Sequence, residues 1–103
     1  MIFDLRKENW LMKFELGKVV MTRSIAELIS KDLVFSFEVT NAAEKYMNCD
    51  WGITCEEDAA MNDEAVKNGD DRVLAVYKTS KGNIWIITEW DRSVTTILFP
   101  SEY

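Results

Sequence analysis

The spacing of apolar residues along the chain changes from a helical period to that of β-strands. An apolar run at residues 14–22 predicts a first strand. Four apolar residues spaced four, three and four apart predict a helix over 33–47. This stripe consists of Phe35, Val39, Ala42 and Tyr46. Residues 36–40 also alternate between polar and apolar, so a strand there is a second interpretation.

Polar residues at the expected helix ends predict three helices before Gly69. Ser24 and Glu27 have the spacing of a capping box, which predicts a short helix ending near Ser30. Asp32 is a suitable N-cap for the helix over 33–47. A second capping box, 54–57, predicts a third helix over 55–68 that ends at Gly69. In this helix Met61 and Ala65 are expected on one face, opposite the acidic residues.

The last third of the chain is rich in strands. Strands are predicted at 72–79, 84–90 and 94–99, joined by turns at 80–83 and 91–93. The order of elements is therefore β-α-α-α-β-β-β. We expect one α+β domain over 1–103, with an antiparallel sheet of about four strands and helices on one face. The last three strands form a meander, 84–90 is central, and the first strand joins at an edge.

Residues 1–12 mix apolar and charged side chains and allow three interpretations. They could form a further edge strand, a helix for self-association, or an N-terminal extension upstream of a start at Met12.

Composition and charge exclude several classes of function. The chain has 103 residues, 48% of them apolar, and a net charge of −6, which argues against direct nucleic-acid binding. It contains no histidine, so a Ser-His-Asp triad and a His-ligated metal are excluded. No apolar run is long enough to span a bilayer, and no glycine-rich phosphate loop occurs. We expect a cytoplasmic protein that is not an enzyme, has no cofactor and does not bind membranes.

Two sets of residues have candidate chemistry that we weigh against structural roles. Cys49 and Cys55 are too few to close a zinc site, and without histidine a catalytic thiol is disfavoured. We expect both to be buried and inert. Glu89 and Asp91 would share one face of a strand and could hold Mg²⁺ in a small nuclease. The alternative is a turn at Asp91 with Glu89 in solvent or paired to an arginine, and it is favoured.

The negative charge is concentrated in one segment. Residues 48–71 contain eight acids and one base, a net charge of −7, whereas the rest of the chain sums to +1. The segment is either a solvated helix face or a surface that imitates phosphates and docks on a basic protein. The residues expected to contact such a partner are Asp50, Glu56, Glu57, Asp63, Glu64, Asp70 and Asp71.

Four segments carry a family resemblance: LGKVVMTR at 16–23, NCDWG at 48–52, NGDDR at 68–72 and the last twenty residues. In these the chain resembles small proteins of bacterial plasmids, phages and integrative elements. Some of these are labelled as modification subunits of type I restriction enzymes. The resemblance covers 14–103, and ITEWDRSVTTILFPSEY is its most specific part. It implies no catalytic residues. The restriction label conflicts with the missing glycine-rich cofactor loop.

The resemblance implies an origin on mobile elements, whose small acidic proteins often antagonise host defences. We therefore expect a non-catalytic inhibitor that binds the basic groove of a bacterial defence nuclease, with a CRISPR effector as the leading candidate. The alternative is an accessory or regulatory module that forms a homodimer through Trp10, Leu11 and the exposed edge of the sheet.

Overall fold

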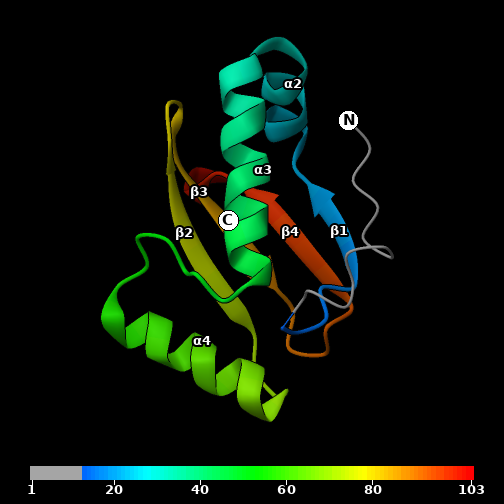
Figure 1. Ribbon diagram of the computed structural model, residues 1–103. Coiled ribbons are helices and arrows are strands. Elements are labelled where there is room, and N and C mark those ends of the chain that lie inside the picture. The colour runs from blue at the N-terminus through cyan, green and yellow to red at the C-terminus, as the bar shows by residue number, and fades with distance from the viewer. Residues whose placement is uncertain (1–12) are drawn as a thin grey trace.

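The computed structural model describes residues 13–103, and the predicted α+β class and order of elements are confirmed. Figure 1 shows the helices and the four-stranded sheet. The three helices are α2 (Arg23–Lys31), α3 (Leu33–Met47) and α4 (Glu56–Asn68). The strands are β1 (Lys18–Met21), β2 (Val73–Thr79), β3 (Gly82–Thr88) and β4 (Val94–Leu98), and a 3₁₀ turn, η2, covers Pro100–Glu102. The interpretations of residues 1–12 concern positions outside the described residues.

The sheet has the order β1-β4-β3-β2, so the predicted meander, the central β3 and the edge position of β1 are confirmed. β2, β3 and β4 pair antiparallel. The expectation of a wholly antiparallel sheet is wrong, because β1 pairs parallel with β4, with Lys18 opposite Val94. The physical reason is the long helical connection, because α2, α3 and α4 lie between β1 and β2 and allow β2, and with it β4, to run in the same direction as β1.

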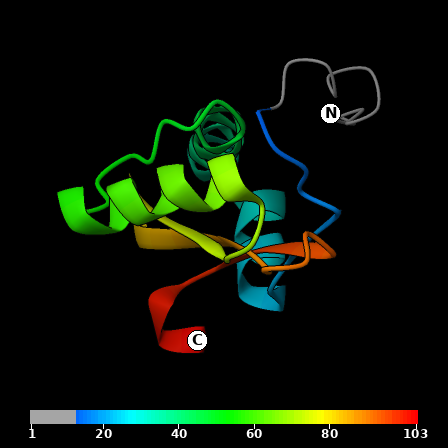
Figure 2. The same ribbon diagram turned by 90° about the horizontal axis from the view of Figure 1, so that it is seen from below.

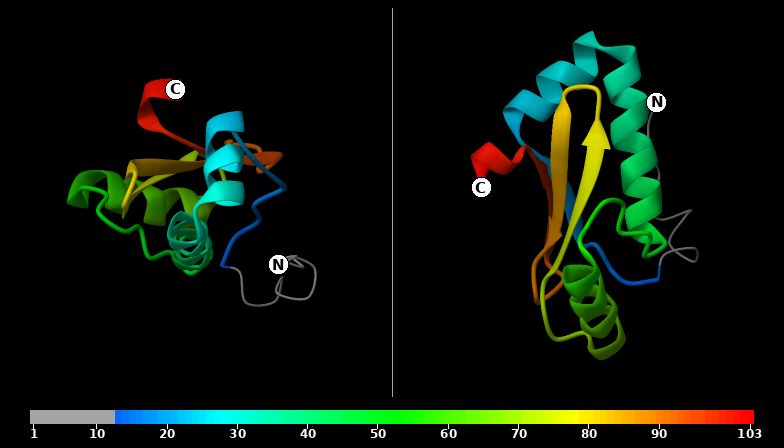
Figure 3. Two further views of the ribbon diagram at one scale, coloured as in Figure 1. Left: turned by 90° about the horizontal axis from the view of Figure 1, so that it is seen from above. Right: turned by 90° about the vertical axis from the view of Figure 1, so that its left-hand side faces the viewer.

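The helices do not all cover one face in the same way. Figures 2 and 3 show α3 against one face of the sheet, with α4 on the same side next to β2. α2 lies across the end of the sheet, and η2 lies on the opposite face. The predicted covering of one face therefore holds for α3 and α4 and not for α2. None of the described helices has the length and apolarity needed to cross a membrane.

The predicted stripe of α3 forms the centre of the core. Its four residues are all buried, and they pack against β-strand residues such as Ile84 and Ile86. The alternative of a strand at 36–40 is wrong, because these residues lie within α3. The core also contains a chain of hydroxyl groups from α3, β3 and β4. Thr88 Oγ1 is 2.7 Å from both the Tyr46 hydroxyl and Thr95 Oγ1, and Thr95 donates to the Leu16 carbonyl.

The helix ends match the prediction at two places. Asp32 accepts a hydrogen bond from the Phe35 amide at 3.0 Å, which confirms it as the N-cap of α3. Gly69 ends α4 in the left-handed conformation, with φ of 68°.

Both predicted capping boxes are wrong. The N-caps of α2 and α4 are Thr22 and Cys55, and neither side chain caps the helix. The hydroxyl groups of the two boxes are used elsewhere, because Ser24 donates to Glu102 and Thr54 donates to the Trp51 carbonyl. In the first box, Ser24 is bonded to Glu102, which is distant in the sequence, instead of to the backbone of Glu27.

Two strands have other bounds than predicted, since β1 is shorter and β3 covers 82–88 instead of 84–90. β1 begins at Lys18, since Gly17 has φ of 63° and a Cβ there would lie 2.3 Å from the Arg92 carbonyl oxygen. β3 ends at Thr88 rather than at residue 90. Trp90 is therefore in the turn and is 64% exposed. Of the other tryptophans described, Trp51 is buried and Trp85 is half-buried.

The outer edge of β2 is largely covered by the chain itself. The Asn62 side chain pairs with both backbone groups of Leu74, with distances of 2.8 Å and 3.2 Å. Two residues further along, the Val76 carbonyl accepts from the Ile53 amide, and the Val76 amide donates to the Thr54 hydroxyl. These contacts protect an edge that would otherwise be open to pairing with another chain.

Candidate interaction surfaces

The predicted acidic residues lie on α4 and on the loops at its two ends. Figures 1 and 3 show α4 at the end of the molecule opposite the α2–α3 connection. All seven side chains are exposed: Asp50, Glu56, Glu57, Asp63, Glu64, Asp70 and Asp71. The ion pairs within residues 13–103 are Arg23–Glu27 and Lys81–Asp32. The acidic surface, as we call these seven residues, is thus without an ion-pair partner among the described residues.

The residues of α4 divide between a buried face and a solvent-exposed face. The buried face of α4 contains Asn62 and Ala65, and helical geometry places Glu57 and Glu64 opposite it. Met61 and Ala65 lie on one side of α4, as predicted, and line one pocket, but only Ala65 is buried, whereas Met61 is 61% exposed. Asn62, whose amide pairs with β2, occupies the position expected of an apolar residue.

Two of the seven carboxylates also stabilise the fold. Asp63 accepts a hydrogen bond from the indole nitrogen of the buried Trp51 at 2.8 Å. Asp50 accepts one from the Gly52 amide at 3.1 Å and belongs to a pocket on the other side of the loop. Substitution of either would change stability as well as charge, so Glu57 and Glu64 are better positions at which to test binding.

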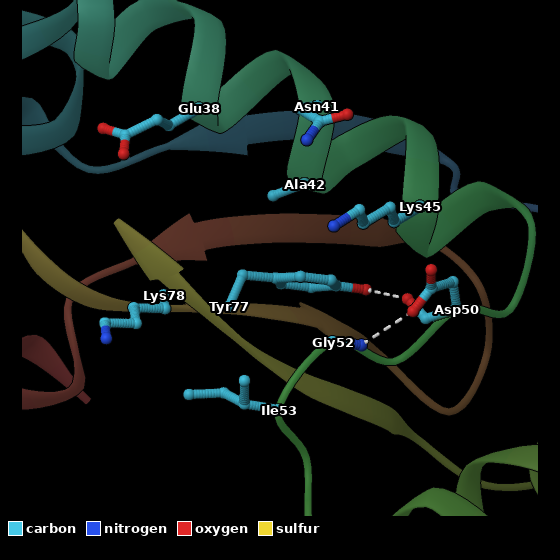
Figure 4. A pocket seen from close by; sticks show the side chains of 9 residues that line it. All are labelled: Glu38, Asn41, Ala42, Lys45, Asp50, Gly52, Ile53, Tyr77 and Lys78. Atoms are coloured by element: carbon cyan, nitrogen blue, oxygen red, sulfur yellow. Dashed lines mark hydrogen bonds between the residues drawn. The ribbon is translucent and has the colours of Figure 1, made fainter. Parts of the chain in front are cut away.

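A second candidate surface is a pocket between α3, β2 and the loop before α4 (Figure 4). Its volume is about 400 Å³. It is lined by Glu38, Asn41, Ala42, Lys45, Asp50, Gly52, Ile53, Tyr77 and Lys78. The Tyr77 hydroxyl donates to the Asp50 carbonyl at 2.7 Å. Burial raises the pKa of Tyr77, so this hydroxyl stays protonated and keeps the loop against β2.

The proposed Mg²⁺ pair does not form. Both Glu89 and Asp91 lie in the turn after β3, so they do not share a strand face. Asp91 accepts from the Ser93 amide, and the pKa of Asp91 is lowered by its hydrogen bonds with Ser93. Within residues 13–103 no group of three or more Cys, Asp or Glu side chains is placed to hold a metal ion.

The arginine of that turn has a role that the sequence analysis missed. Arg92 adopts φ of 61° and donates from its guanidinium to the carbonyls of Ala65, Glu89 and Asp71. The Ala65 carbonyl also accepts from the Gly69 amide, so it takes two hydrogen bonds, and Arg92 joins the C-terminal end of α4 to the β3–β4 turn. Glu89 is exposed and has no ion pair among residues 13–103, which is the solvent alternative of the favoured interpretation, and Arg92 binds carbonyl groups.

The cysteines are both free thiols. Cys49 is half-buried, and burial raises the pKa of its thiol, which lowers its reactivity. Cys55, expected to be buried, is exposed at the N-cap of α4. It lies outside the core because α4 turns its polar N-terminal residues to solvent.

Comparisons of the chain with protein-family models, with curated proteins and with solved structures found no match. The surfaces described above therefore have to be interpreted from their own chemistry.

Proposed function

We propose that this protein is a non-catalytic inhibitor whose acidic surface binds the basic, nucleic-acid-binding groove of a bacterial defence nuclease. A CRISPR effector is the leading target class, on the basis of the sequence resemblance. The observation that carries the proposal is the exposure of the acidic surface, without ion pairs among residues 13–103. A basic groove would supply the missing counter-charges, and complementary charge accelerates association.

The spacing of the carboxylates suits such a groove. Glu57 and Glu64 are seven residues apart on α4, or roughly 10 Å along its axis. A nucleic-acid strand carries one phosphate per ~3.4 Å, so these two carboxylates can occupy the positions of phosphates three apart. Binding of this kind weakens as salt screens the charges over distances of about 10 Å.

The test is a charge reversal with a matched control. Tagged protein is used to capture purified CRISPR effectors and restriction complexes at low and high salt. The double variant E57K/E64K should bind on the order of tenfold more weakly or not at all. The control E15K/E44K makes the same change of net charge at two exposed acids away from α4 and should bind almost normally.

Both variants should melt at nearly the temperature of the wild type, because the four side chains are exposed and form no ion pairs with other residues of the described part, 13–103. Equal loss of binding in both variants would indicate a general charge effect. Normal binding by E57K/E64K would refute docking through α4.

Self-association is a second candidate, supported by a different observation. Three large apolar side chains at the start of α3, Leu33, Val34 and Phe37, are each at least 60% exposed. β1 also lies at the edge of the sheet, with Met21 exposed. Trp10 and Leu11, the other predicted contacts, are outside the described residues. Sedimentation should then give a salt-insensitive dimer that F37S converts to a monomer; a monomer at all concentrations would refute this candidate.

A further inference from the structure

One position on the outer edge of β2 is left without a hydrogen-bond partner. The backbone groups of Leu74 and Val76 point outward and are bonded by the chain itself. Alternate residues of a strand point the same way, so the amide and carbonyl of Lys78 also face outward. Neither has a partner among residues 13–103. Beyond Lys78 the edge is closed again, because Glu38 accepts from the Ser80 amide at 2.9 Å.

The gap at Lys78 lies beside the pocket of Figure 4, whose lining includes two ammonium groups and two carboxylates. Glu38 holds Ser80 through both carboxylate oxygens, and Asp50 holds the Gly52 amide. The ammonium group of Lys45, in contrast, has no ion pair among residues 13–103, and Figure 4 shows its side chain extending over Tyr77. The Lys78 amide, the Lys78 carbonyl and the unpaired Lys45 ammonium group thus surround the same pocket.

We propose that this pocket binds the C-terminal residue of an extended peptide through its free carboxylate. The amide of the bound residue donates to the Lys78 carbonyl, and one carboxylate oxygen accepts from the Lys78 amide. This is the double hydrogen bond of an antiparallel strand pair. The other carboxylate oxygen accepts from the Lys45 ammonium, which is a charge-assisted bond.

The edge of β2 explains why the peptide must end there. In an antiparallel arrangement the bound chain approaches from the Ser80 end and pairs with β2 at Lys78 alone, because Glu38 already takes the Ser80 amide. Further residues would meet Gly52 and Ile53, which already occupy the edge at Val76. The position of Lys45 near the Gly52 side of the pocket matches the end of the chain.

The wall of the pocket also indicates which last residue is preferred. Ile53 lines the pocket and is 54% exposed, although it is apolar. An apolar final side chain would cover it and remove its surface from water. Asp50 is the one residue that this site shares with the acidic surface, so the existence of the site does not depend on the proposed inhibition of a nuclease.

The experiment uses the full chain, labelled with ¹⁵N, and two synthetic peptides. Acetyl-Ala-Ala-Ala-Leu with a free carboxylate should shift the amide signals of Lys78, Gly52 and Ile53 in NMR spectra. The same peptide with a C-terminal amide should bind at least about tenfold more weakly, because it loses the charged partner of Lys45. Equal affinity for the two peptides, or shifts that avoid Lys78, would overturn the proposal.

Two pairs of variants separate the backbone contact from the ammonium contact. K78A keeps the outward amide and should bind the free acid, whereas K78P removes that amide and should not. Proline is tolerated at an edge position whose amide faces outward, and far-ultraviolet circular dichroism checks that the sheet is intact. K45M should lose the preference for the free acid, whereas K31M, a change at an exposed lysine of α2, should keep it. Wild-type preference in K45M would overturn the proposal even if K78P does not fold.

Discussion

Asn62 provides the sharpest test of how α4 is attached to the sheet. Its side chain is buried and donates to the Leu74 carbonyl at 2.8 Å while accepting from the Leu74 amide at 3.2 Å. A side-chain amide carries both a donor and an acceptor, so it can satisfy a backbone amide and a backbone carbonyl together. We therefore expect substitution of Asn62 to loosen α4 from β2.

The loss in N62A can be worked from these two bonds. Each contributes about 0.5–1.5 kcal/mol net, so the free energy of unfolding should fall by about 1–3 kcal/mol. Alanine is the better helix former by several tenths of a kcal/mol, which hides part of that loss. The control N68A shares the helix-propensity gain at an exposed position of α4, where the side chain makes one long bond of 3.3 Å to Glu64. The difference between N62A and N68A isolates the edge contacts.

N62D adds a pH dependence of known sign. The introduced carboxylate, when ionised, can accept from the Leu74 amide but places a negative oxygen against the Leu74 carbonyl. Burial and that carbonyl should raise the pKa of the introduced carboxyl group in the folded state above its unfolded value of about 3.9. The folded state then binds a proton more readily, so the stability of N62D relative to wild type should rise as pH falls through the raised pKa.

The assay is urea unfolding followed by tryptophan fluorescence, since the buried Trp51 is bonded to Asp63 of α4. Wild type, N62A, N68A and N62D are compared at pH 7 and pH 5. If N62A and N68A were equally stable within about 0.5 kcal/mol, the Asn62 bonds would not stabilise the fold. If N62D kept a constant difference from wild type at both pH values, the contact between its carboxylate and the Leu74 carbonyl would be wrong.

Two further predictions concern the core and the C-terminal turn. T88V removes the hydroxyl between Tyr46 and Thr95 and should lower the free energy of unfolding by about 1–2 kcal/mol in urea unfolding, whereas T96V, which breaks no side-chain bond, should change it little. Equal effects would contradict the hydroxyl chain. The pKa of Glu102 is lowered from 4.5, first by its bond from Ser24 and then by the Phe99 amide. These bonds should persist at pH 7 and be lost as pH falls through the lowered pKa. Near-ultraviolet circular dichroism of Trp85 and Tyr103, which pack edge to face, should follow that loss in wild type and not in E102Q.

Sequence reasoning succeeded for the fold where a local pattern determines the structure. The stripe of α3 and its cap at Asp32 depend on residues within a few positions of one another, so both were predicted. The capping box at Ser24 failed because Glu102, at the other end of the chain, takes its hydroxyl. The parallel pairing of β1 was also missed, since no local pattern specifies which edge of a sheet a strand joins.

The candidate surfaces divide in the same way. Exposure of the acidic residues follows from the period of α4 and could be predicted. The pocket at Lys78 could not, because three separate segments of the chain form it. For the contact between α4 and β2 one signal was available in the sequence. Asn62 lies three residues before Ala65 on the buried face of α4, and a buried side-chain amide needs hydrogen-bond partners. That signal indicates contact with backbone but does not identify β2 as the partner.

The parallel pairing of β1 with β4 has a consequence for the order of folding. During synthesis β1 leaves the ribosome early, but its hydrogen-bonding partner is the last strand of the sheet to appear. Until then the apolar residues of β1 and the β4-facing edge of β3 have no partner, whereas the β2–β3 hairpin can form from neighbouring residues. Because such long-range pairing is slow, we expect closure of β1 onto β4 to limit the folding rate. Chains stalled before β4 would expose an unpaired edge, and their aggregation is the hazard that this topology creates.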